Sequence, residues 1–328
     1  MYEQANECDN LTLIKKPLIS YYGGKQRIAS KIIPHLEAIP HTVRAIPFAG
    51  GLGVETEWER PSVTNNDHYC VAINDTDEQL INLYRVARDQ PDALHHKITG
   101  TPYSQSEHQL SIHIYKNPTD YDDVTRAWAY FVNAQMSFAN KLNGGWGTAV
   151  YGRNKPATWC NKLNRLSDVL KRFKDVYIGC EDALKFIERW DSPQTLFYLD
   201  PPYPSANQGH YDGYTLSDFK ALCDLLDHID GSYVLSNYPQ SVEPQSAQKR
   251  IEIKAHCSAS GQGKVGKDRD KSKAATKDEL GDRARTEVLW ICDRSDSIQR
   301  HDLRKVLNMD EASQPHQSEP TTQQLSLL

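Results

Sequence analysis

The sequence predicts an α/β fold, in which helices cover both faces of a mostly parallel β-sheet. Short apolar runs recur along the chain, and each ends in a small, acidic or proline residue. Near-continuous apolar runs of this length are typical of strands that are buried on both faces of a parallel sheet. Segments with helical periodicity lie between these runs, and such an alternation of strands and helices indicates a doubly wound sheet.

Strands and helices can be assigned in order along the chain. Strands are expected over 42–51, 68–75, 176–182, 195–203, 232–238 and 286–293. Helices are expected over 77–89, 181–190 and 215–229. The last helix begins with a threonine and a serine before Asp218, and these residue types favour a helix N-terminus.

One interval, from Gln90 to Asp175, lacks strand-like runs. Within it, 123–138 has the pattern of an amphipathic helix, and 141–155 is rich in glycine and asparagine, which indicates a β-hairpin or an extended loop. We therefore expect a mostly helical insertion between two halves of the sheet. The N-terminal lead, the basic loop 258–285 and the C-terminal tail are polar, and we expect them to be disordered or mobile.

The composition indicates a globular protein outside the membrane. The chain has 328 residues, of which 38% are hydrophobic and 25% are charged. No apolar run approaches the roughly 18 residues that cross a bilayer, and the N-terminus lacks the pattern of a secretory signal. Seven cysteines occur without a CxxC pair, which favours free thiols in a reducing compartment over disulfides or a zinc site. We expect a cytoplasmic protein with no membrane partner and no metal.

The net charge of −5 opposes binding to a polyanion unless basic residues are locally concentrated. Residues 153–174 are such a concentration, with a net charge of +6 because Asp168 is the only acid among seven cations. A second basic stretch runs from Lys249 to Arg285. Either stretch could instead be a solvated surface, as charge runs often are. Our candidates for contact with nucleic acid are in the first stretch: Arg153, Lys155, Lys162 and Arg165.

The most informative motif is Asp200-Pro201-Pro202-Tyr203, which ends the apolar run TLFYLDPPY. It places a carboxylate and a rigid turn at the sheet edge where open α/β folds bind ligands. Because proline has no N–H, the Asp200 carboxylate and the Pro201 carbonyl are acceptors without a competing donor. Two acceptors that hold the hydrogens of an aryl amine favour the pyramidal geometry in which its lone pair can attack a methyl group. Tyr203 adds a flat face on which an extruded base can stack, an interaction worth roughly 1–3 kcal/mol. An ordinary turn after a strand is the alternative.

A glycine-rich turn, PFAGGLGVE (47–55), follows the first expected strand. Closely spaced glycines let the backbone approach a ligand and expose its amides. Asp75 ends the next expected strand, 22 residues after Gly53, and this spacing suits a carboxylate that accepts hydrogen bonds from ribose hydroxyls. Asp182 could hold an adenine amino group or, more simply, cap a helix. The turn lacks a P-loop lysine–serine pair, which argues against ATP or GTP.

A third motif, SYYGGKQRIASKI (20–32), places Gly23, Gly24 and Lys25 before a basic helical segment. A lysine beside a glycine turn could neutralise a carboxylate, such as that of a methionine moiety, or lie on the surface.

Together these motifs resemble the D12 class of N6-adenine DNA methyltransferases, to which the Dam enzymes belong. The order is similar across residues 17–293: YYGGK, PFAGG, NDxDxxLxxxY, an inserted region, a strand with Asp182, DPPY, and the later strands VLSN and EVLW. The resemblance implies a Rossmann-like S-adenosylmethionine-dependent sheet with an antiparallel hairpin strand and a mostly helical target-recognition domain. The domains would be a disordered lead (1–16), a catalytic domain (17–89 and 176–293), the target-recognition insertion (90–175) and a polar disordered tail (294–328).

The resemblance also implies a reaction and the residues that perform it. A methyl group of S-adenosylmethionine would pass to N6 of an adenine flipped from duplex DNA, at a specific site and in a cytoplasmic protein of bacterial or phage type. The target adenine would be held by Asp200, Pro201, Pro202 and Tyr203. The cofactor would be bound by Tyr21, Gly24, Lys25, Phe48, Gly50, Gly51, Asp75, Asp182 and Asp200.

Two positions depart from the family pattern. Tyr21 stands where the family commonly has tryptophan. The family pattern F-x-G-x-G would place glycine at Leu52, whereas this chain has Gly50, Gly51 and Gly53. We expect the cofactor turn to be shaped differently as a result.

Two other readings of the motifs stay open. The first is a methyltransferase that acts on another planar nitrogen, such as cytosine N4, an RNA base or a protein glutamine. The second is a non-catalytic DNA-binding protein that keeps this fold. Separately, the C-terminal peptide Gln324-Leu325-Ser326-Leu327-Leu328 resembles peptides that dock on the DNA sliding clamp, although a chance match is the alternative.

Overall fold

The computed structural model describes residues 15–21, 23–60, 69–148, 154–204, 213–256 and 284–296. Within these ranges a seven-stranded sheet has the order β3-β2-β1-β4-β5-β7-β6. β1 to β5 pair in parallel, whereas β7 is antiparallel to β5 and β6. The predicted α/β fold with an antiparallel hairpin at one edge is confirmed. The strands are β1 (Val43–Ile46), β2 (Cys70–Asn74), β3 (Val176–Gly179), β4 (Thr195–Leu199), β5 (Ser232–Asn237), β6 (Lys249–His256) and β7 (Ala284–Cys292).

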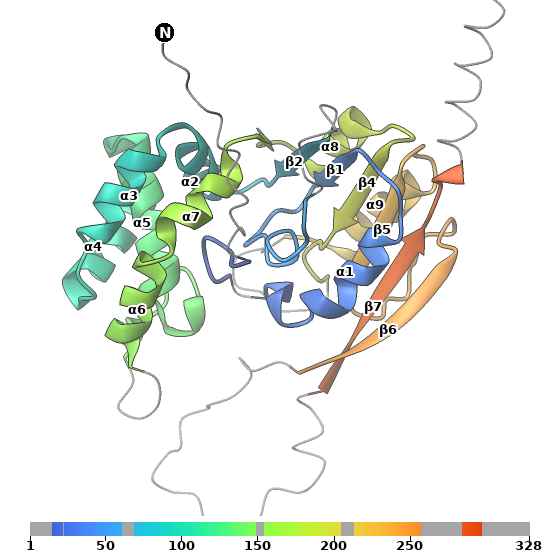
Figure 1. Ribbon diagram of the computed structural model, residues 1–328. Coiled ribbons are helices and arrows are strands. Elements are labelled where there is room, and N and C mark those ends of the chain that lie inside the picture. Colours follow the sequence, from blue (N-terminus) through green and yellow to red (C-terminus); the bar gives the residue numbers. More distant parts are fainter. Residues whose placement is uncertain are drawn as a thin grey trace, which may run out of the picture.

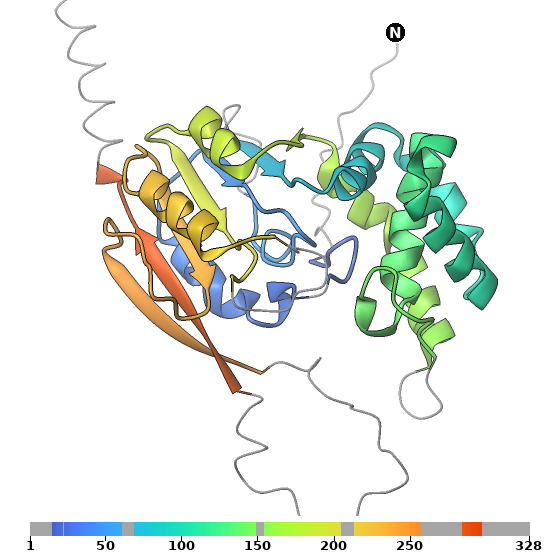
Figure 2. The same ribbon diagram turned by 180° about the vertical axis from the view of Figure 1, so that it is seen from behind.

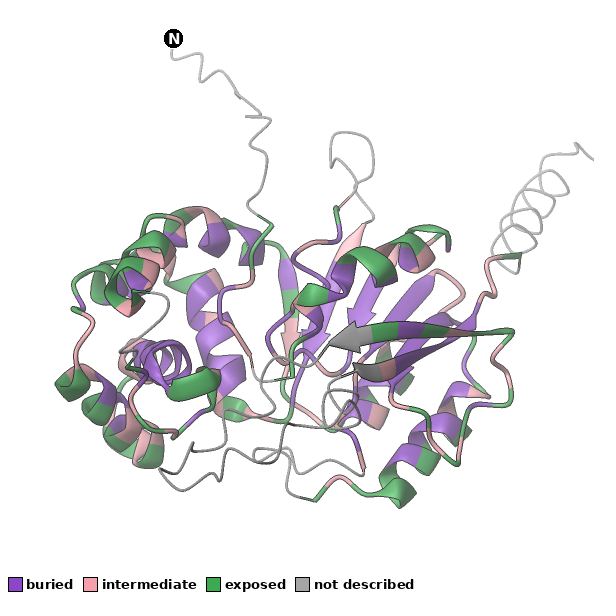
Figure 3. Ribbon diagram, turned by 90° about the horizontal axis from the view of Figure 1, so that it is seen from below, coloured by how far each residue is buried: buried purple, intermediate pink, exposed green. Residues whose placement is uncertain are grey.

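Helices cover both faces of the sheet (Figures 1 and 2). α1 (Ala29–Glu37) packs on one face against Leu196 and Tyr198 of β4. α8 (Ala183–Trp190) and α9 (Leu216–Leu226) cover the other face, against Phe197 and Leu199 of the same strand. Successive side chains of a strand point to opposite faces, so β4 contributes to both cores. This double burial explains its uninterrupted apolar run, and Figure 3 shows the central strands buried along their length.

β6 was not predicted as a strand, and its position explains why. Among the described strands it lies at one edge of the sheet, where it pairs with β7 alone. Ile251 and Ile253 pack toward the core beneath α1, while Arg250, Glu252 and Lys254 are exposed. An edge strand with one solvated face alternates apolar and charged residues, and charged side chains protect such an edge from further pairing. Because of these charges, we interpreted this part of the sequence as a basic surface stretch and did not predict a strand there.

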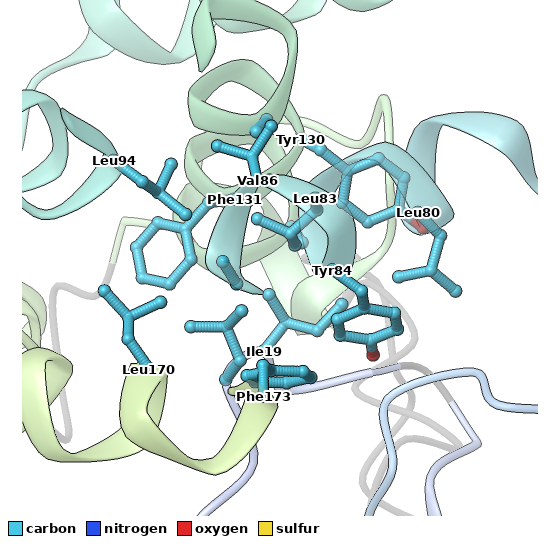
Figure 4. Close-up of a cluster of buried hydrophobic side chains, with 14 of the residues drawn as sticks. Ile19, Leu80, Leu83, Tyr84, Val86, Leu94, Tyr130, Phe131, Leu170 and Phe173 are labelled. Atoms are coloured by element: carbon cyan, nitrogen blue, oxygen red, sulfur yellow. The ribbon is translucent and has the colours of Figure 1, made fainter. Parts of the chain in front are cut away.

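The helices that the structure describes between β2 and β3 gather beside the sheet (Figure 1). α5 is their centre, and its side chains are buried from Ala127 to Met136. Figure 4 shows Leu83 of α2 packed near Leu94, Phe131 and Leu170 of α3, α5 and α7. The helices are α2 (Glu78–Asp89), α3 (Pro91–Thr99), α4 (Gln105–Lys116), α5 (Asp123–Met136), α6 (Lys155–Leu163) and α7 (Leu166–Leu170).

The segment after α5 is an irregular loop rather than a hairpin over its described part, residues 137–148. One isolated bridge joins Ser137 and Trp146. Ala139, Asn140 and Asn143 have positive φ angles of 55°, 56° and 57°, so the chain turns repeatedly in a small space. The three segments predicted to be disordered or mobile (1–16, 258–285 and 294–328) lie largely outside the described residues, but residues 284 and 285 belong to β7. Across the described ranges, no helix is long and apolar enough to cross a membrane.

Candidate functional site

A cavity of about 440 Å³ lies at the carboxyl ends of β1, β2 and β4. β1 and β4 are neighbours, and the chain continues from them in opposite directions across the sheet. Ligands of open α/β folds bind at such a switch point. The residues predicted to bind cofactor and adenine all line this one cavity: Tyr21, Gly24, Lys25, Phe48, Gly50, Gly51, Asp75, Asp182, Asp200, Pro201, Pro202 and Tyr203.

The glycine turn after β1 is fixed at Gly50 from two sides. The Gly50 N–H donates to Asp75 Oδ2 at 2.9 Å, and the Tyr84 hydroxyl donates to the Gly50 carbonyl. The second oxygen of Asp75 accepts from the Asp77 N–H at 3.0 Å. These residues form the motif NDxDxxLxxxY, so the structure shows what its spacing achieves. Tyr84 lies about two turns along α2 from its N-cap Asp77, and its hydroxyl reaches the chain that Asp75 holds.

The remaining glycines make room for the Tyr21–Gln26 segment. A Cβ on Gly51 would lie 2.4 Å from Tyr21 Cβ, and one on Gly53 would lie 2.9 Å from the Gln26 nitrogen. Leu52, where the family pattern expects glycine, has a positive φ of 53° and a buried side chain. The shape of the turn is thus kept by a leucine in a conformation that costs most residues roughly 1–2 kcal/mol.

Two further polar residues fix the rim of the cavity. Asn74 is fully buried; its amide donates to the carbonyls of Pro47 (3.1 Å) and Glu181 (3.0 Å) and accepts from the Glu181 N–H (3.0 Å). It therefore ties the ends of β1, β2 and β3 together. Asp182 caps α8, because its Oδ1 accepts from the N–H groups of Leu184 and Lys185. The simpler role considered for Asp182 is present, and its side chain lines the cavity as well.

A buried cluster of charges joins Lys25 to the DPPY motif. Lys25 Nζ lies 2.6 Å from Asp200 Oδ1 and 3.4 Å from Glu287 Oε1, and it also contacts the Tyr203 hydroxyl. Burial opposes the charge on Lys25, but Asp200 and Glu287 outweigh it and raise the pKa of Lys25 above its ordinary value. Burial raises the pKa of Glu287 as well. The lysine is therefore charged at neutral pH and holds the carboxylate of Asp200 at a fixed place.

The comparison with known families agrees with this geometry. A family model described as D12 class N6 adenine-specific DNA methyltransferase matches residues 21–255, well over half of the chain. The chain belongs to this family. It is an enzyme, and its reaction is methylation of adenine N6 in DNA. A search of curated proteins found no match.

Sequence reasoning missed one acidic residue of this methyltransferase site. Glu287 lies in EVLW of β7, beyond the residues that the family model matches. Its carboxylate accepts from Ser236 Oγ at 2.7 Å and from the Tyr203 hydroxyl at 3.2 Å. The signal was a lone glutamate within a strand whose neighbours Val288, Leu289 and Trp290 are buried, because such an acid needs a partner.

Tyr203 differs from the expectation that its ring is free for a base. It is only 8% exposed, and its ring stacks on Tyr238 with a centroid separation of 4.1 Å. Lys25 Nζ lies 4.6 Å from the ring centroid. Stacking of a base on Tyr203 stays a prediction.

The basic candidates for DNA contact lie apart from the cavity, on the helical group of the methyltransferase. Lys155 and Lys162 belong to α6, and Arg165 immediately precedes α7. Lys162 and Arg165 line a second, smaller cavity of about 70 Å³. Arg153 lies outside the described residues. Over those residues, no group of three or more His, Cys, Asp or Glu side chains could hold a metal ion.

Proposed function

We propose that the large cavity binds S-adenosylmethionine and that Asp200 to Tyr203 hold an adenine flipped from duplex DNA. The observation that supports this most is the Lys25–Asp200 ion pair, which fixes the acceptor carboxylate inside the cavity that the glycine turn also lines. Ligand pockets commonly have volumes of about 300–1,000 Å³, and the cavity falls within that range.

The lining suits the parts of the cofactor. Asp75 is 5% exposed, and its carboxylate interacts with the backbone N–H groups of Gly50, Thr76 and Asp77. A carboxylate has about four lone-pair sites, so it can still accept from a ribose hydroxyl. Phe48 and Tyr214 meet edge to face at 6.4 Å and form an aromatic wall beside Asp182. Asp182 Oδ2 is not used by the helix cap and is available to an adenine amino group. Bound in this way, the cofactor supplies a methyl group on a sulfonium that leaves as a neutral thioether.

Asp200 and Pro201 prepare the amine for attack. With Oδ1 held by Lys25, Oδ2 of Asp200 can accept one N6 hydrogen of adenine, and the Pro201 carbonyl can accept the other. The N6 lone pair would then point toward the methyl group that the cofactor supplies, and the proton that N6 loses on methylation would pass through Asp200 Oδ2 to water. Positioning and exclusion of water supply much of the rate in such a transfer. Lys25 would act on Asp200 and on the cofactor's carboxylate from one position.

We further propose that residues 90–175 form the target-recognition region. Lys155, Lys162 and Arg165 would neutralise phosphates, with Arg153 of the neighbouring stretch. Phe138, on the irregular loop after α5, is 59% exposed. Proteins that unstack or extrude bases often insert an apolar side chain between base steps, and Phe138 has the exposure that this requires.

Labelled methyl transfer to duplex DNA, followed by nucleoside digestion, tests the function. N6-methyladenine is expected; label in N4-methylcytosine or only in RNA would overturn the proposal. Asp200→Ala should abolish transfer while calorimetry shows S-adenosylmethionine binding retained within about tenfold. Asp224→Ala, which removes an exposed acid from α9, is the control and should keep its activity.

Two finer proposals rest on sequence alone. The protein would be cytoplasmic, and residues 324–328, outside the described part, would dock on the DNA sliding clamp. Fluorescence anisotropy of the tail peptide with purified clamp tests the second. If the anisotropy does not saturate at clamp concentrations of tens of micromolar, which corresponds to a binding free energy of about −6 kcal/mol, the proposal is wrong.

A further inference from the structure

The smaller cavity, of about 70 Å³, lies between the N-terminal segment and the helical group. It is large enough for more than one water molecule. Cations enter it from three elements, namely Lys16 of the N-terminal segment, Lys162 of α6 and Arg165 before α7. Its other lining residues are neutral: Pro17, Leu18, Ser20, Gln26, Phe131, Leu166 and Val169.

Lys162 has no acidic partner among the described residues. Its Nζ donates to Ser20 Oγ at 3.3 Å, and the charges that act on it are those of Lys155 and Arg165. Burial, together with these two like charges, lowers the pKa of Lys162 to about 8. Nearby cations of the same stretch are paired, since Lys171 lies 2.9 Å from Asp168 and Arg172 lies 3.5 Å from Glu55.

A partly buried ammonium among other cations is unfavourable unless an anion joins it. The cavity also offers a hydroxyl from Ser20 and a guanidinium from Arg165, so it presents several donors to one compact oxyanion. Ser20 and Gln26 flank Tyr21 and Lys25, which line the large cavity. The two cavities therefore lie on neighbouring parts of one chain segment.

We propose that the small cavity, lined by Lys16, Ser20, Lys162 and Arg165, is a preformed site for one backbone phosphate of the bound DNA strand. This inference rests on the proposed function and adds a fixed anchor next to the flipped adenine. Phosphate contacts set the register of a protein on its duplex, so an anchor here would place the strand before the base leaves the stack.

The test compares Lys162→Met with Lys174→Met, which removes the same charge from an exposed position of the same stretch. DNA affinity is measured at several salt concentrations. Lys162→Met should reduce the slope of log K against log salt by about 0.9, the contribution of one phosphate, and weaken binding several-fold at low salt. Lys174→Met should keep the wild-type slope. A wild-type slope in Lys162→Met overturns the proposal.

Two further measurements separate the possible causes. S-adenosylmethionine affinity should be preserved in Lys162→Met, because Lys162 does not line the large cavity; a wild-type enzyme that does not methylate DNA would instead overturn the proposed function. Inorganic phosphate, compared with chloride at equal ionic strength, should raise the Tm of the wild type and not of Lys162→Met. If phosphate does so but the DNA salt slope is unchanged, the site takes free phosphate and the DNA assignment fails.

Discussion

Lys25 Nζ lies 2.6 Å from Asp200 Oδ1, although the two residues are 175 positions apart in the chain. Lys25 lies before α1, whereas Asp200 immediately follows β4, so the ion pair joins two elements that the fold brings together at the carboxyl edge of the sheet. Glu287 adds a second carboxylate on the lysine from β7. The cluster that fixes the Asp200 carboxylate is therefore built from three separate parts of the chain.

Lys25→Met should impair both stability and turnover. Removing one partner of a buried pair leaves unpaired carboxylates, which costs about 3 kcal/mol of unfolding free energy, and Asp200 would lose its fixed orientation. We expect kcat to fall at least about tenfold, since each 1.36 kcal/mol of barrier is tenfold in rate. Urea unfolding and single-turnover methylation measure the two effects.

Two further variants, Glu287→Gln and Lys31→Met, are compared with Lys25→Met. Glu287→Gln keeps a polar group beside Ser236 and Tyr203 but removes the negative charge that Glu287 places next to Lys25. It should therefore lower kcat less than Lys25→Met does. Lys31 is exposed on α1, and Lys31→Met should behave as the wild type. Unchanged kcat in Lys25→Met would show that the ion pair does not orient Asp200.

Gly51→Ala should weaken cofactor binding. The new Cβ would lie 2.4 Å from Tyr21 Cβ, a distance that forces the Tyr21 segment away from the glycine turn. We expect the Kd for S-adenosylmethionine to rise about tenfold or more, a loss of about 1.4 kcal/mol. Calorimetry measures it. Gly145→Ala is the matched control, because a Cβ there meets no atom within 4 Å; equal affinities in the two variants would contradict the packing argument.

Cofactor binding should weaken in acid. Burial raises the pKa of Asp75 to about 6, and its ionised form is the better acceptor for ribose hydroxyls. The affinity should be constant above pH 7 and fall by up to about tenfold per unit below pH 6. Asp75→Asn should bind weakly at every pH and lose this dependence. Titrations between pH 5 and pH 8 test it, and a flat wild-type profile would refute the assignment.

The same pKa has the opposite consequence for folding. Because ionised Asp75 is less favourable in the folded protein than in the unfolded chain, its contribution to stability is fully present below about pH 4 and is lost as the pH rises through 6. Asp75→Asn should therefore reduce this loss. Unfolding free energies at pH 4 and pH 7 separate the folding effect from the binding effect.

Phe138→Ala should reduce catalysis on DNA without affecting the cofactor. Stacking against a base is worth roughly 1–3 kcal/mol, so kcat/KM for duplex DNA should fall between about fivefold and a hundredfold. Leu110 is also exposed, at 45%, but lies on α4, and Leu110→Ala serves as the control. If kcat/KM for duplex DNA falls no more in Phe138→Ala than in Leu110→Ala, the Phe138 side chain has no special role at the DNA.

The central parallel strands were predictable because they are buried on both faces, whereas β3 at the edge exposes Tyr177. Apolar runs such as 195–199 leave a continuous signal, and the positions of Asp75 and Asp200 at strand ends followed from it. The hairpin edge was different. β6 alternates charged and apolar residues, so its pattern is that of a surface segment, and only its pairing with β7 identifies it.

Motif spacing located the cavity lining but not the contacts within it. Lys25 was expected near the cofactor, yet its measured partners are Asp200 and Glu287. Such pairings depend on packing between distant segments, which no local pattern encodes. The positive φ of Leu52 was also invisible in the sequence, although its departure from the glycine pattern marked the turn as unusual.

The packing of α2 against α5 bears on how recognition could be transferred between relatives. One continuous hydrophobic cluster contains Leu83 of α2, Phe131 of α5 and Val71 of β2, and the Tyr130 hydroxyl donates to Asp77, the residue that caps α2. An exchange cut at residue 90 would graft a foreign α5 onto a native α2 and leave mismatched surfaces in that cluster. Chimeras that take α2 together with its partner helices from the same relative should fold. The segment to exchange when DNA sequence specificity is transferred would therefore begin at the end of β2.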